Sequence, residues 1–176
     1  MMLRPTIALA LLWSITVIAP AGAITGDDAP PPPGDPARDA YEAGLAAFEA
    51  GDWQAVIDRM ATVIEVRPWH ADAYNRLGFA WRKLGDYDRA LAFYDKALEL
   101  DPHHRGALEY LGEAYLELDR PDDAQALLER LATECRRIAN GDGDWRARCE
   151  EWQDLQAAYD AWRGARPEAA ADGKTR

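Results

Sequence analysis

The residue types that most often serve as metal ligands and nucleophiles are scarce in this chain, which holds only two cysteines and three histidines. It contains no His-Glu zinc motif, no nucleophile elbow and no glycine-rich phosphate loop. Its many carboxylates are typical of solvated helix faces rather than of acid–base catalysis. We therefore expect a protein that is not an enzyme and that has no metal or cofactor.

The chain also lacks an apolar run long enough to cross a membrane. The longest, Ile7 to Ile18, has about a dozen residues, whereas a membrane-spanning helix needs about 20. Arg4 precedes this run, and Ala21-Gly22-Ala23 follows it as a small-x-small cleavage site. This predicts a signal peptide over residues 1–23 rather than a membrane anchor. Cleavage after Ala23 would give a periplasmic or secreted protein that is no longer attached to a membrane.

Basic residues are the minority among the charged ones. Lys and Arg number 20 against 31 Asp and Glu, which gives a net charge of −11. The predicted signal peptide carries one base, Arg4, and no acid, so its removal makes the chain more acidic still. Such a charge repels phosphate backbones and anionic lipid surfaces. We expect a protein or peptide partner, and neither nucleic acid nor membrane.

Two segments lack the apolar residues that a packed core requires. Residues 24–36 (ITGDDAPPPPGDP) favour an extended polyproline conformation, which predicts a disordered linker. Residues 164–176 are polar and rich in alanine, which predicts a disordered tail. Between them, residues 37–163 are long enough to form one helical domain with a continuous core.

A 34-residue pattern organises this domain. Gly44, Gly78 and Gly112 are separated by 34 residues each time. Around them, apolar residues recur three and four positions apart, which predicts pairs of amphipathic helices that bury one face. The pattern divides the chain into three units, residues 37–70, 71–104 and 105–138.

The middle unit resembles the tetratricopeptide repeat, a helix pair with the pattern W-x2-L-G-x2-Y, A-x3-F and P. The residues at those positions are Tyr74, Leu77, Gly78, Trp81, Ala90, Tyr94 and Pro102. The resemblance implies an all-α fold, a right-handed α-solenoid of three helix pairs. Arrays of this family commonly end in a capping helix, which we place at residues 144–163 with Asp144 as its N-cap. The stretch from His103 to Glu113 is similar to small exported bacterial repeat proteins.

The two cysteines lie on the apolar stripes of two expected helices. Cys135 continues the stripe of the last repeat helix, and Cys149 lies on that of the capping helix. If these stripes pack together and the protein is exported, a structural disulfide is expected. The alternative, a redox pair, would need C-x-x-C spacing or a cysteine at a helix start, and we expect neither.

Two weaker patterns could indicate metal sites. Asn140, Asp142, Asp144 and Glu151 stand at positions one, three, five and twelve of a calcium loop. Trp145 occupies the glycine position of that template, so a turn and a helix cap explain these residues better. His70 and His104 are one repeat apart, too far for a shared zinc ion, and are expected to be polar residues at helix starts.

In the resembling family the first helices of the units line a concave groove that binds partner segments. The residues that would do so here are Tyr41, Phe48, Asn75, Phe79, Arg82, Glu109 and Glu113. We expect them to bind a segment with an apolar anchor and a basic residue. The family's clamp for C-terminal carboxylates is not expected, because Leu45 replaces a required Asn and the third unit is acidic there.

Two alternatives remain for this groove and for the function. The chain's own terminal or linker segments could fill the groove, since three repeats make a shallow one. The main interpretation is an exported protein–protein interaction scaffold. The alternative is a non-catalytic accessory or assembly factor for an envelope enzyme.

Overall fold

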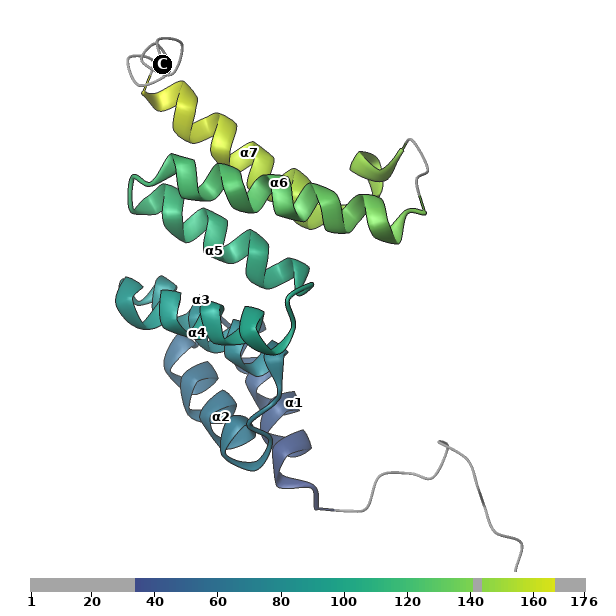
Figure 1. Ribbon diagram of the computed structural model, residues 1–176. Coiled ribbons are helices and arrows are strands. Elements are labelled where there is room, and N and C mark those ends of the chain that lie inside the picture. The colour runs from purple at the N-terminus through teal and green to yellow at the C-terminus, as the bar shows by residue number, and fades with distance from the viewer. Residues whose placement is uncertain (1–33, 141–143, 167–176) are drawn as a thin grey trace, which may run out of the picture. The chain divides into compact units, whose positions relative to one another are not determined.

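The computed structural model describes residues 34–140 and 144–166, and these are helical without any β-strand (Figure 1). The predicted signal peptide, most of the linker and most of the tail lie outside the described residues. The helices are α1 (Pro36–Glu49), α2 (Trp53–Val66), α3 (Ala71–Lys83), α4 (Tyr87–Leu100), α5 (Arg105–Glu117), α6 (Pro121–Ile138), the 3₁₀ helix η1 (Trp145–Arg148) and α7 (Glu150–Ala165). The predicted all-α solenoid of helix pairs with a further C-terminal helix is confirmed.

Each pair begins and ends for local chemical reasons. The Asp52 and Asp86 side chains accept hydrogen bonds from the free backbone N–H groups at the starts of α2 and α4. Gly85 has a φ of 81°, which lets the chain turn sharply after α3. Nδ1 of His70 and of His104 accepts from the first turns of α3 and α5. The two histidines are therefore helix caps.

Close packing within a pair depends on a glycine in its first helix. A Cβ atom on Gly78 would lie 2.7 Å from the ring of Tyr94, which is fully buried in α4. The third pair differs, because a Cβ atom on Gly112 would instead meet Leu155 of α7 at 2.6 Å. Leu155 is also fully buried. Thus α7 packs on the glycine of α5 in the way that α4 packs on the glycine of α3.

The C-terminal helix differs from our prediction of one helix over residues 144–163. Cys149 has an extended backbone (φ −116°, ψ 91°), which separates η1 from α7. Asp144 makes no side-chain capping bond, and Cys149 is the N-cap residue of α7 instead. We expected neither cysteine at a helix start, and this expectation is wrong for Cys149. The predicted tail also begins too early, because α7 continues to Ala165.

The two cysteines lie side by side between α6 and α7. The structure joins Cys135 to Cys149 by a disulfide with Cα atoms 5.9 Å apart. Both side chains are buried in the cluster formed by α5, α6, η1 and α7, which includes Leu131, Trp145 and Leu155. The bond therefore crosslinks the last repeat to the helix that covers it.

Two features are absent from the described parts of the chain. Among residues 34–140 and 144–166, no helix is both long and apolar enough to cross a membrane. The same residues contain no group of three or more His, Cys, Asp or Glu side chains placed to hold a metal ion.

Candidate functional site

The first helices of the three pairs meet along one surface, which we call the inner surface. It is formed by the facing side chains of α1, α3 and α5, together with those of α7 that adjoin them. Phe48, Phe79 and Tyr110 form a row across it, with successive ring centroids 4.8 Å apart. Trp53 of α2 joins the row at 5.5 Å from Phe79. Aromatic pairs at such distances attract one another, so this row joins the repeats.

Arg82 links α3 to α5 beneath this row. It is only 4 % exposed and forms ion pairs with Glu113 at 2.7 Å and Glu117 at 3.3 Å. Its guanidinium carbon lies 5.1 Å from the centroid of Phe79 and 5.8 Å from that of Tyr110. The charge of Arg82 is thus already satisfied within the protein.

Glu109 is a buried carboxyl group on the same face of the array. It is 7 % exposed, and no ion pair joins it to any described residue. Burial and the nearby carboxylates of Glu113, Asp154 and Glu151 raise its pKa to about 8. Asn75 is also buried, against Gly106, and its Oδ1 accepts no hydrogen bond within residues 34–140 and 144–166.

The Glu109 carboxyl should make stability depend on pH. Its pKa is higher in the folded chain than in the unfolded chain, so the folded chain binds the proton more tightly. The free energy of unfolding should therefore fall as pH rises from about 5 to 8. Glu109→Gln removes this dependence and should be the more stable protein at pH 9, by about 1–3 kcal/mol.

Urea unfolding at several pH values would measure this effect. Glu49→Gln, which changes an exposed glutamate on α1, is the matched control and should follow the wild-type profile. A Glu109→Gln variant whose stability runs parallel to that of the wild type from pH 5 to 9 would show that this carboxyl does not carry the effect.

A pocket of about 400 Å³ opens on the inner surface between α3, α5 and α7. Leu116, Ala158 and Trp162 supply its apolar lining. Lys83 and Glu117 are exposed charged residues that also line it. Pockets of this size accept a large side chain or a small ligand. The inner surface therefore has room for one apolar group flanked by charges of both signs.

The structure brings the predicted groove residues together but changes their expected exposure. Phe79 is half-buried between other rings rather than exposed, and Asn75, Arg82 and Glu109 are buried. Removing Phe79 and Arg82 together should therefore lower stability as well as affect binding. The reason is that neighbouring first helices lie close enough for their inward side chains to fill the space between them. Of the remaining predicted residues, Tyr41, Phe48 and Glu113 are half-buried.

Sequence reasoning missed the contribution of α7 to this surface. Trp162 of α7 packs against the core cluster of the last repeat, and it also lines the pocket with Ala158. Its indole Nε1–H donates to Asp119 at 3.2 Å, which fixes the ring at the end of α5. The apolar stripe of α7 indicated which residues pack against the last repeat. It did not indicate which of them would remain accessible.

Comparison with known proteins identifies the repeated unit. Sequence profiles of the tetratricopeptide repeat match residues 71–104 and 107–135. An FK506-binding protein-like protein of Rattus norvegicus is 39% identical over 89 residues, or 49% of this chain and 26% of the relative. The Homo sapiens counterpart is 37% identical over 89 residues. The chain thus spans about a quarter of the length of the curated relatives it matches.

Solved structures share the arrangement of helices. The TPR2B-domain:pHsp70 complex of yeast Sti1 superimposes with a TM-score of 0.62 at 24% identity, over 73% of this chain and 98% of that one. MamA gives a TM-score of 0.56 at 28% identity, over 59% of this chain and 61% of its own. The first TPR of Spaghetti (RPAP3), bound to the HSP90 peptide SRMEEVD, gives 0.53 at 17% identity, over 69% of this chain and 93% of that one.

Proposed function

The chain is a tetratricopeptide repeat protein, and from this premise we propose that it is a non-catalytic scaffold that binds a segment of a partner protein on its inner surface. The observation that carries the proposal is the pocket between α3, α5 and α7, with its apolar lining and charged rim. Apolar anchors seated in such pockets supply most of the affinity in protein interfaces. Two similar folds, those of Sti1 and RPAP3, are described in complexes with chaperone peptides.

The charges around this pocket are of both signs, because Arg82, Lys83 and Arg166 line it together with Glu113 and Glu117. Arg82 pairs with both glutamates and Arg166 pairs with Asp119, and Glu117 is the more exposed of the two glutamates at 42 %. The RPAP3 peptide SRMEEVD is itself acidic at its end. Such an end would meet the exposed Glu117 at the rim, so we propose that the preferred segment combines an apolar side chain with Lys or Arg.

Selection from a library of displayed random peptides tests this preference on residues 24–176. We expect enrichment of an apolar residue close to Lys or Arg. Glu117→Lys reverses a 42 % exposed side chain on the rim and should weaken the selected peptides about tenfold. Glu99→Lys reverses a 69 % exposed glutamate on α4 and is the control. Peptides that bind both variants as tightly as wild type would exclude this pocket as their site.

We also propose that the protein is exported and that its disulfide forms after export. The support is the predicted signal peptide over residues 1–23 together with the geometry that pairs Cys135 with Cys149. Intact-mass analysis of protein from its native source should give a chain that begins at Ile24 and lacks two hydrogen atoms. A soluble protein that still begins at Met1, or one with two free thiols, would contradict this proposal.

A further inference from the structure

A second pocket lies away from the inner surface, between α6, η1 and α7. Its volume is about 460 Å³. Leu128 and Ala132 of α6 line it together with the indoles of Trp145 and Trp152, which meet edge to face at 5.2 Å. It shares no lining residue with the pocket between α3, α5 and α7. This surface therefore needs an explanation of its own.

Two exposed arginines stand over the indoles of this pocket. The guanidinium carbon of Arg136 lies 5.2 Å from the centroid of Trp145. That of Arg146 lies 4.7 Å from Trp145 and 5.5 Å from Trp152. Neither arginine forms an ion pair with a carboxylate in the described parts of the chain. A guanidinium that stacks on a ring keeps its N–H edges free, so both can still bind an anion.

Most other arginines that stack on a ring in the described residues also pair with a carboxylate. Five of them also form an ion pair with a carboxylate. These pairs are Arg82 with Glu113, Arg89 with Asp86, Arg120 with Asp123, Arg163 with Asp160, and Arg166 with Asp119. Among the described residues, Arg76, which stacks on Phe48, is the other stacked arginine without a carboxylate partner. No second described arginine of this kind stacks on the same ring. Only at the second pocket do two such arginines converge.

We propose that this pocket binds a partner protein segment in which an Asp or Glu side chain is adjacent to an apolar one. The carboxylate would complete the ring–guanidinium–carboxylate arrangement at Arg136 and Arg146, and the apolar side chain would contact Leu128 and the indoles. Among the described residues, Glu129 is the one carboxylate that lines the pocket, so the two arginines leave a local positive charge.

The protein's overall charge distinguishes this partner from other anions. The net charge of −11 repels nucleic acid and anionic membranes at long range. A short segment with one or two carboxylates is repelled less than these polyanions. The local attraction of the two guanidinium groups can therefore exceed the repulsion. The pocket is also large enough for an apolar side chain beside the carboxylate, which free inorganic anions do not supply.

The pocket is held in shape by bonds that flank η1. The disulfide between Cys135 and Cys149 ties the end of η1 to α6. Gln153 of α7 donates through Nε2 to the carbonyl oxygen of Arg146 at 2.6 Å. Binding should therefore weaken when the disulfide is removed, because η1 then has to be ordered on binding.

Titration of the full chain with small dipeptide amides, followed through the tryptophan indole N–H signals in NMR, tests the proposal. N-acetyl-Phe-Glu-amide should shift the signals of Trp145 and Trp152 in a saturable way. N-acetyl-Phe-Gln-amide and N-acetyl-Phe-Lys-amide should bind about tenfold more weakly. Arg136→Gln with Arg146→Gln should cost a similar factor, and Arg136→Lys with Arg146→Lys should recover part of it.

The control is Arg89→Gln, which removes a stacked arginine that already has its carboxylate and should leave the titration unchanged. Circular dichroism verifies that each variant is folded. Equal binding of the three dipeptides, or equal binding by the Arg136→Gln, Arg146→Gln variant, would overturn the proposal. So would tighter binding of a short oligothymidylate at the same indoles, which would indicate a polyanion site instead.

Discussion

Replacing Arg82 with alanine is expected to lower the free energy of unfolding by about 3 kcal/mol. Arg82 is buried between α3 and α5, and its removal leaves Glu113 and Glu117 without their cation. It also removes the guanidinium stacked against Phe79. Because these contacts join two repeats, chemical unfolding should shift to lower urea concentration.

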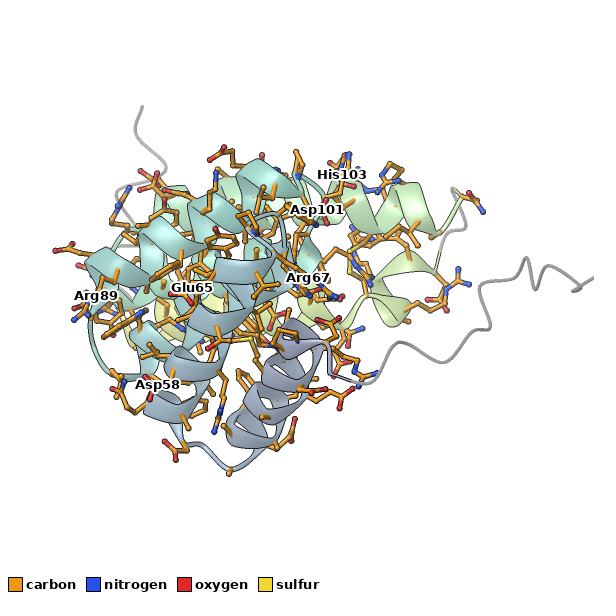
Figure 2. All side chains as sticks on the ribbon, turned by 90° about the horizontal axis from the view of Figure 1, so that it is seen from below. Asp58, Glu65, Arg67, Arg89, Asp101 and His103 are labelled. Carbon is orange, nitrogen blue, oxygen red and sulfur yellow. A yellow bond between two sulfur atoms is a disulfide. The ribbon has the colours of Figure 1, made fainter. Side chains whose placement is uncertain are left out.

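Arg89→Ala provides the matched control for this result. Arg89 also stacks on a ring and pairs with a carboxylate, but it projects outward from the helices and is exposed (Figure 2). Exposed ion pairs of this kind contribute about 0–1 kcal/mol. Similar losses for the two variants would show that burial does not increase the contribution of Arg82 to stability, and would contradict this prediction.

Removing the crosslink between Cys135 and Cys149 should also destabilise the protein by about 3 kcal/mol, because it closes a short loop in the unfolded chain. The effect should concentrate in α7, which the bond ties to α6. Hydrogen exchange of the reduced protein should accelerate in α7 more than in α3 and α4. The double variant Cys135→Ala, Cys149→Ala should reproduce this pattern.

The double alanine variant also provides the control for the reducing agent itself. A thiol reductant should change the stability of the wild-type protein and leave that of the variant as it was. If reduction changes neither the unfolding midpoint nor the exchange in α7, the crosslink does not hold the helix in place.

The repeating part of the fold could be predicted because its causes are local. A glycine such as Gly78 recurs wherever two helices must approach closely, and Asp52 and Asp86 recur where second helices begin. Proline and glycine at fixed positions end the helices. Spacing along the chain therefore contains the helix pairs, their order and their length.

The ends and surfaces of the array depend on distances that spacing does not contain. Nothing in the residues from Asp144 to Cys149 indicates that the helix must break there. The break accompanies the contact of Cys149 with Cys135, which depends on the position of α6. Spacing indicated that Arg82 lies on the inner surface but not that it would be buried. That outcome depends on the approach of α5, which brings Glu113 and Glu117 to it.

The pocket with Arg136 and Arg146 could not be predicted from the sequence for the same reason. The two arginines come from different helices and converge only because η1 folds back over α6. In the sequence they are two basic residues in an acidic chain. The residues between them are most simply interpreted as a turn between two helices followed by a helix cap. The missing information is again the path of the chain around Cys149.

Site-specific photo-crosslinking tests most directly whether the inner surface binds a partner protein. A photoreactive phenylalanine replaces Lys83, at the rim of the pocket between α3, α5 and α7, or Lys96, which pairs with Glu99 on α4. The account predicts that irradiation in the native host joins a discrete partner to the Lys83 variant and that Glu117→Lys removes this product. Crosslinking from the Lys96 variant alone, or a product from Lys83 that Glu117→Lys leaves intact, would contradict it.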